Sequence, residues 1–147
     1  MGKKGNETVL IVDDDPLALE LIELMLLPLG YQVLLATSSE EALELAENNG
    51  GKIDLLLTDM MMPGLTGLDL VKQFIKKYPK TKVLFMSGYL CPSIAHQDVA
   101  SSEKAFVLKP FTTNTLAKKM REVLKSNYIP SFENDDTTEG ILQIPAE

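Results

Sequence analysis

The sequence predicts a single α/β domain in which five parallel strands form one sheet with helices on both faces. Short apolar runs alternate five times with segments of helical periodicity, the pattern typical of a sheet assembled from strand–helix units. Each apolar run is short enough to be a strand buried on both faces, and each ends at polar residues. The 147 residues, 45% of them apolar, suit one domain with one core.

The first unit is predicted to be a strand over Thr8–Val12 followed by a helix. Asp15 is expected to cap this helix, and Pro16 to take its first position, where a missing N–H costs nothing. Gly30 is expected to end it. The two glutamates of the helix should face water, and its apolar positions are Leu17, Leu21, Leu24 and Met25.

Four more units follow in the same pattern. Their strands are predicted over Tyr31–Ala36, Ile53–Thr58, Lys82–Met86 and Ala105–Leu108. The second helix is predicted to begin at a cap formed by Ser38 or Ser39, and the fifth at a cap formed by Thr112 or Thr113. The third and fourth helices are predicted over Leu65–Tyr78 and Pro92–Ala100. Right-handed crossovers and the strand order 2-1-3-4-5 complete the predicted doubly wound sheet.

Composition divides the chain into three parts. Residues 1–7 are predicted to be a disordered N-terminus and residues 8–126 to be the folded domain. Of the 21 acidic residues, five follow Ser126, and no Lys or Arg does. Residues 127–147 are therefore predicted to be an acidic, largely disordered tail.

Several classes of protein are excluded or disfavoured. No apolar run approaches the ~18 residues of a transmembrane helix, and the N-terminus has no apolar signal-peptide core. The single Cys91 has no partner for an internal disulfide, and with the single His96 it cannot form a zinc site. The absence of a dense basic stripe argues against direct nucleic-acid binding. A cytoplasmic protein without membrane contact is expected.

Reactive side chains follow four of the five predicted strands. The first strand is followed by Asp13 and Asp14, the third by Asp59, the fourth by Ser87 and the fifth by Lys109. Since parallel strands end at one edge of the sheet, where ligands bind in such folds, these residues are expected to lie together.

The chemistry of this set favours phosphoryl transfer. Crowded carboxylates need a compensating cation, and their hard oxygen atoms suit Mg²⁺. A carboxylate can also accept a phosphoryl group as an acyl phosphate. The cation, the ammonium of Lys109 and the hydroxyl of Ser87 would then stabilise the charge on the three phosphoryl oxygens.

The chain resembles the receiver domain of bacterial response regulators, the CheY-like family with a flavodoxin-like fold. The resemblance covers about residues 8–125. It is carried by four motifs in order: Asp13-Asp14-Asp15-Pro16, Asp59-Met60-Met61-Met62-Pro63 closing on Gly67, Met86-Ser87-Gly88-Tyr89, and Lys109-Pro110-Phe111. The last two motifs are especially similar to receiver modules of hybrid sensor histidine kinases.

The resemblance implies a role for each rim residue. Asp59 would take a phosphoryl group from phosphohistidine or a small phosphodonor, and Lys109 would pair with its oxygens. Asp14, Asp59 and the backbone carbonyl of Met61 would bind Mg²⁺ directly, and Asp13 through a water molecule. The Lys109–Pro110 peptide bond would be cis.

The resemblance also implies a switch and a slow reset. Ser87 would move to bond the phosphoryl group and Phe106 would turn inward behind it, changing the face formed by the fourth helix, fifth strand and fifth helix. Phe106 has no hydroxyl, so its two states would differ only in packing. Met61 lacks a polar end that could position water, so slow loss of the phosphoryl group is expected.

The expected partner is a histidine kinase or a histidine phosphotransfer domain, and a homodimer is possible. As an isolated chain the protein would not be an enzyme beyond its own phosphorylation and dephosphorylation. A longer parent, with this chain as its C-terminal part, could be a histidine kinase. Two alternatives stay open: an interaction module that is not phosphorylated, and a haloacid-dehalogenase-like phosphohydrolase. The latter class wants an Asp two residues after the nucleophile, where Met61 stands.

Overall fold

The computed structural model describes residues 7–62, 66–87 and 106–126. Within them, five parallel strands form one sheet in the order β2-β1-β3-β4-β5, which confirms the predicted fold class and topology. The strands are β1 (Thr8–Val12), β2 (Gln32–Ala36), β3 (Leu55–Asp59), β4 (Lys82–Ser87) and β5 (Phe106–Leu108). The helices are α1 (Pro16–Leu26), η1 (Leu27–Leu29, a 3-10 turn), α2 (Ser39–Asn48), α3 (Gly67–Lys77) and α5 (Thr113–Lys125). The helix predicted over Pro92–Ala100 lies outside the described residues.

The helix starts follow from side-chain caps. The side chain of Asp15 accepts a hydrogen bond from the N–H of Leu17, as predicted. Of the two pairs left open by the sequence, the structure selects Ser38 for α2 and Thr112 for α5. In each case the hydroxyl oxygen accepts a hydrogen bond from the backbone N–H three residues later. This N–H lies in the first turn and has no acceptor within the helix.

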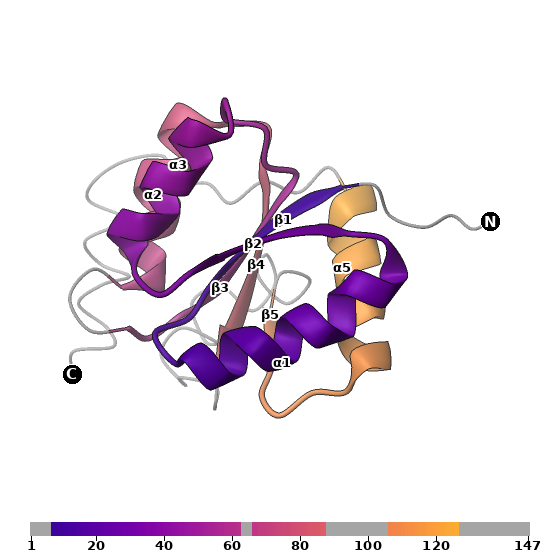
Figure 1. The fold of residues 1–147 in the computed structure, drawn as a ribbon. Helices are drawn as coiled ribbons and strands as arrows, with labels where there is room; N and C mark the ends of the chain where they lie inside the picture. The colour runs from indigo at the N-terminus through magenta and orange to yellow at the C-terminus, as the bar shows by residue number, and fades with distance from the viewer. Residues whose placement is uncertain (1–6, 63–65, 88–105, 127–147) are drawn as a thin grey trace, which may run out of the picture.

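Helices cover both faces of the sheet (Figure 1). α1 and α5 pack on one face, and α2 and α3 pack on the other. Successive strand residues point to opposite faces, so Leu10 and Val12 join the core under α2 and α3, while Val9 and Ile11 join the core under α1 and α5. All four are completely buried, which accounts for the continuous apolar sequence of this strand.

Three of the four apolar positions that the sequence indicates on α1 do not face the core. Leu17, Leu21 and Leu24 are 69%, 59% and 67% exposed. The helix instead packs through a different apolar row, which consists of Leu19, Ile22 and Leu26. Apolar residues occur on more than one side of this helix, so periodicity alone could not choose which side meets the sheet. On the last helix, α5, the buried residues are Leu116, Met120 and Val123.

The structure leaves the predicted domain limits untested, because residues 1–6 and 127–147 lie outside the described part of the chain. No helix in that described part is both long enough and apolar enough to span a membrane.

Candidate functional site

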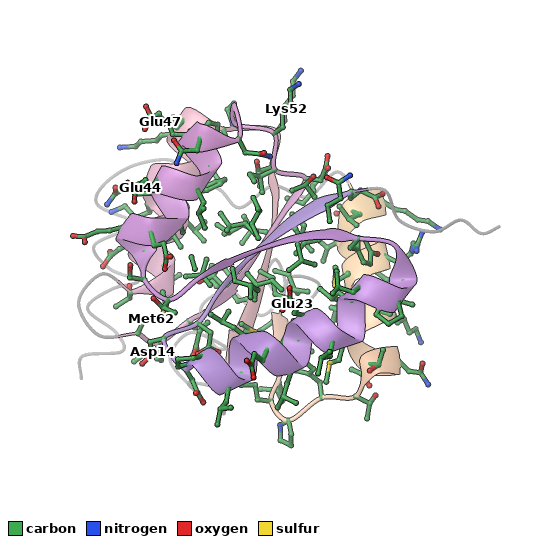
Figure 2. All side chains as sticks on the ribbon, in the orientation of Figure 1. Asp14, Glu23, Glu44, Glu47, Lys52 and Met62 are labelled. Atoms are coloured by element: carbon green, nitrogen blue, oxygen red, sulfur yellow. The ribbon has the colours of Figure 1, made fainter. Side chains whose placement is uncertain are left out.

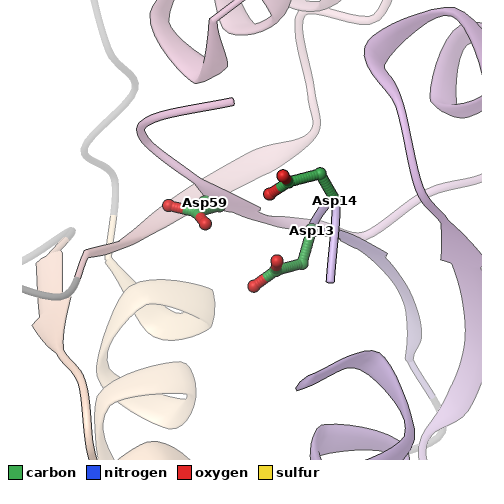
Figure 3. Close-up of side chains that lie close together, drawn as sticks. All are labelled: Asp13, Asp14 and Asp59. Atoms are coloured by element: carbon green, nitrogen blue, oxygen red, sulfur yellow. The ribbon is translucent and has the colours of Figure 1, made fainter. Parts of the chain in front are cut away.

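Three carboxylates meet at the carboxyl edge of the sheet. Asp13 and Asp14 directly follow β1, and Asp59 is the last residue of β3. These two strands are paired in parallel, with Val12 opposite Thr58, so both end at the same edge. One carboxylate oxygen from each aspartate lies within 4.8 Å of the other two. Figure 3 shows the three side chains extending into one shared space.

Lys109 joins the carboxylates from the end of β5. Its Nζ lies 2.7 Å from Oδ2 of Asp13 and 3.4 Å from Oδ2 of Asp59. The Asp13 side chain is only 1% exposed, so its charge depends on this ammonium for compensation. The backbone N–H of Lys109 donates to the carbonyl of Ser87 at 2.7 Å, which ties the lysine to the end of β4. The Lys109–Pro110 bond is cis, as the resemblance implied.

The backbone around Asp59 fixes where its side chain points. The N–H of Met61 donates to Oδ1 of Asp59 at 3.2 Å. The first turn of α3 presses on the same segment: a Cβ added to Gly67 would lie 2.2 Å from the Asp59 carbonyl oxygen. Only glycine fits there, and its N–H donates to the carbonyl of Met60. In the sequence, Gly67 is recognisable only as the last residue of a motif. Its close approach to the Asp59 carbonyl explains why glycine is needed there.

The other predicted site residues lie at or near the same edge. Ser87 ends β4, is buried, and follows Met86, the residue paired with Asp59. The side chain of Met61 is 56% exposed, as its position beyond the strand suggests. Phe106 is partly buried and packs against the core under α2 and α3. The structure gives these placements, and the roles of the residues remain predictions.

Burial and neighbouring charges shift the pKa values of Asp59 and Lys109. Burial raises the pKa of Asp59 and the Asp13 charge raises it further, whereas the Met61 N–H and Lys109 lower it; the net direction is upward. Burial lowers the pKa of Lys109, but the hydrogen bond and charge of Asp13 and the charge of Asp59 outweigh it, so this pKa is raised. Lys109 is therefore an ammonium at neutral pH.

The donor set fits Mg²⁺. Three carboxylates beside one ammonium leave an excess of negative charge that a divalent cation would balance. Both oxygens of Asp13 already have partners, namely Lys109 Nζ at 2.7 Å and the N–H of Asp15 at 2.9 Å. Asp14 is exposed and Asp59 is partly exposed. This difference suits direct binding by Asp14 and Asp59, with Asp13 in a supporting role.

Comparisons with known proteins agree with this geometry. Residues 9–121 match the family model described as the response regulator receiver domain. The chain is 35% identical over 121 residues to the sensor kinase CckA of Brucella abortus (strain 2308), covering 82% of this chain and 13% of the relative. It is 31% identical over 127 residues to a cyclic di-GMP phosphodiesterase of Thermotoga maritima, covering 86% of this chain and 33% of that relative. The chain thus spans a third or less of the length of these two proteins.

Solved structures give the same result for the fold. A response regulator receiver domain protein from Clostridium thermocellum aligns with a TM-score of 0.69 at 27% identity, covering 80% of this chain and 94% of the other. The Vibrio cholerae chemotaxis protein CheY4 aligns with a TM-score of 0.70 at 27% identity, covering 80% of this chain and 98% of the other.

Proposed function

The chain belongs to the response regulator receiver domain family, and we propose that it is a phospho-acceptor switch in which Asp59 receives a phosphoryl group with the help of Mg²⁺. The observation that carries this proposal is the convergence of three carboxylates within 4.8 Å beside the Lys109 ammonium. Such a set suits acyl phosphate formation, because an acceptor, a cation site and a fixed positive charge lie together.

Each residue of the site has a defined part in the proposed reaction. The Oδ2 of Asp59 lies nearest to Lys109, and Oδ1 is held by the Met61 N–H. A carboxylate oxygen of Asp59 attacks phosphorus as the phosphorus–nitrogen bond of phosphohistidine breaks, and the imidazole leaves. Lys109 pairs with the phosphoryl oxygens. Asp14, Asp59 and the Met61 carbonyl would hold Mg²⁺, which would neutralise part of the phosphoryl charge.

The proposed response is a change in packing behind the site. Ser87, at the end of β4, would bond the phosphoryl group. Phe106 lies opposite Phe85 in the β4–β5 pair and is only partly buried. In the proposed response its ring would become more buried. The readout would then be the face formed by β5, α5 and the helix predicted over Pro92–Ala100. That predicted helix lies outside the described residues.

The partner we propose is a histidine kinase or a histidine phosphotransfer domain, reached in the cytoplasm. The exposed leucines of α1 suit such a donor, since Asp15 caps that helix beside the site. A groove of about 200 Å³ between α1 and the loop after β5 adds apolar surface from Leu21, Met25 and Phe111. α1 contains two glutamates and no basic residue, so the complementary surface would be an apolar helix flanked by Lys or Arg. The activity of any longer parent, including a histidine kinase, belongs to this proposal as well.

Phosphorylation of the purified chain tests the proposal directly. With acetyl phosphate and Mg²⁺, intact mass should increase by one phosphoryl group in the wild type and not in Asp59→Asn. Glu47→Gln is the matched control, because it removes an exposed carboxylate on α2 that points away from the site (Figure 2). The control should be phosphorylated like the wild type.

Failure of the wild type to gain a phosphoryl group, together with no Mg²⁺-dependent NMR shifts at Asp14 and Asp59, would reject the proposal. The interaction module without phosphorylation would then be the better reading of the fold.

A further inference from the structure

A second recess lies at the amino edge of the sheet, opposite the candidate phosphorylation site. It is a groove of about 630 Å³ formed by Thr8, the first residue of β1, and by residues that precede β3 and β4. In Figure 2, Lys52, which lines this groove, stands at the opposite end of the molecule from Asp14 and Met62. Nothing in the proposed phosphoryl transfer uses this region.

The groove combines an aromatic floor with a basic rim. The Tyr78 ring packs so closely on Gly51 that a Cβ added there would lie 2.6 Å from the ring. Three exposed lysines line the groove, namely Lys52, Lys77 and Lys80. One acidic residue, Asp54, also lines it, and its carboxylate accepts a bond from the Thr8 N–H at 2.8 Å. The rim therefore has surplus positive charge, and the partly exposed ring of Tyr78 lies beside the Lys77 ammonium, 6.0 Å from Nζ to the ring centroid.

The chain leaves its last helix beside this groove. The Nζ of Lys82 lies 2.6 Å from the carbonyl oxygen of Ser126, which follows α5. Lys82 begins β4 and directly follows Thr81, which lines the groove. Ser126, the last residue that the structure describes, is therefore bonded to the residue that directly follows the groove residue Thr81.

The composition of that segment matches the groove. Residues 127–147 contain five acidic residues and no Lys or Arg. Tyr128 and Phe132 come first and Glu133, Asp135 and Asp136 follow. An extended chain spans about 3.3 Å per residue, so the seven residues from Ser126 to Glu133 reach up to ~23 Å. Both the apolar and the acidic side chains can thus reach the groove.

We propose that residues 127–147 bind this groove of their own chain, with carboxylates paired to the lysine rim and aromatic side chains over Tyr78. The short tether makes the contact intramolecular, with an effective concentration on the order of millimolar, so modest individual ion pairs suffice. The contact should weaken with salt, because the Debye length falls from about 30 Å at 0.01 M to about 3 Å at 1 M. This inference does not depend on phosphorylation of Asp59.

Paramagnetic relaxation in the full-length chain tests the proposal. A nitroxide is placed on Ser131→Cys in a Cys91→Ser background, and amide signals are recorded at about 20 mM salt. The amides of Lys52, Tyr78 and Lys80 should lose most of their intensity, and those of α1 should not. The effect should disappear at about 500 mM salt and in the tail variant Glu133→Lys/Asp135→Lys/Asp136→Lys.

Charge reversal in the groove provides a second test. Lys52→Glu/Lys77→Glu/Lys80→Glu should also abolish the effect. The matched control Lys72→Glu/Lys76→Glu/Lys118→Glu changes the net charge equally outside the groove and should retain it. The tail variant leaves the folded part unaltered, so it still decides the question if the groove variant fails to fold.

Three results would overturn the proposal. The first is groove amides that relax no faster than those of α1. The second is paramagnetic relaxation of the groove amides that persists both at about 500 mM salt and in the tail variant. The third is relaxation of an isotope-labelled chain by a spin label on a different, unlabelled chain, which would assign the groove to a second copy.

Discussion

At the scale of single residues, the pair between Lys109 and Asp13 is the contact on which the site most depends. Asp13 is almost fully buried, and the ammonium 2.7 Å away compensates its charge. Removing one partner of a buried pair leaves an uncompensated charge, which costs more than the pair itself contributes. The raised pKa of Lys109 keeps this contribution complete at neutral pH; it is lost only as the pH rises through that pKa, above the ordinary value of 10.5.

We expect Lys109→Met to lower the free energy of unfolding by about 1–3 kcal/mol, less than for a fully buried pair because the Lys109 side chain is 27% exposed. Urea denaturation at neutral pH without divalent cations measures the change. Lys118→Met, at an exposed position on α5, is the control and should change stability by less than about 0.5 kcal/mol. Equal effects of the two substitutions would mean that Asp13 does not need Lys109.

Asp59 has the opposite effect on the metal-free protein. Its pKa is raised above the ordinary 3.8, chiefly by burial. The stabilising contribution of its protonated form is present below pH 3.8 and is lost as the pH rises through the folded-state pKa. At pH 7 the ionised carboxylate therefore disfavours the fold, which agrees with the proposal that this site binds a cation.

Asp59→Asn should accordingly raise the thermal midpoint at pH 7 in EDTA, by about 2–5 °C for a domain of this size. The amide keeps the shape of the side chain and removes the charge. Thermal unfolding followed by circular dichroism provides the measurement, and the gain should shrink below pH 4. A midpoint that is lower than that of the wild type in EDTA would show that Lys109 already compensates both carboxylates.

Much of the site could be predicted from residues at strand ends, and one part could not. Asp13, Asp14, Asp59 and Lys109 were found because parallel strands end at a common edge, which follows from topology. The contact of Gly67 with the Asp59 carbonyl depends on how closely α3 approaches β3. No local sequence pattern encodes that distance.

At the scale of elements, local sequence signals predict where a helix begins better than they predict which side of the helix faces the core. Caps and turn residues place the start of α1, α2 and α5, because a cap acts on the first few backbone donors. The buried side of α1 depends instead on which apolar row meets the sheet. Leu19 and Ile22 pack inward, and the row of Leu17, Leu21 and Leu24 remains exposed.

That exposed row should matter for the donor and little for stability. We expect Leu17→Gln/Leu21→Gln/Leu24→Gln to change the free energy of unfolding by no more than about 1 kcal/mol, since exposed positions have little packing to lose. Phosphotransfer from a histidine kinase that phosphorylates the wild type should slow by about tenfold or more, equivalent to ~1.4 kcal/mol or more. Phosphorylation by acetyl phosphate, which needs no docking surface, should be unchanged.

The comparison of the two donors separates docking from chemistry. Equal slowing with both donors would place the leucines in support of the site itself, and no slowing with either would remove α1 from the docking surface. Leu26→Ala is the structural contrast, because Leu26 is fully buried. It should cost about 2–5 kcal/mol in stability.

At the scale of the whole molecule, one sheet links the site to both halves of the core. β1 and β3 present Asp13 and Asp59 at their ends, and the same strands contribute side chains to the core on either face. Neither core can lose its packing without loosening the strands that position the carboxylates. The described fold should therefore unfold as one cooperative unit, and ligand binding at the rim should stabilise all of it.

Mg²⁺ should consequently raise the urea midpoint without changing the slope of the transition, because the metal binds the folded state and leaves the surface exposed on unfolding the same. At a concentration about 100 times its dissociation constant, the expected gain is ~2.7 kcal/mol. Asp14→Asn should lose most of this gain by weakening direct metal binding, whereas Glu47→Gln, at an exposed position on α2, should keep it. A changed slope or a second transition would mean that Mg²⁺ orders only the rim, and that the two cores do not unfold together.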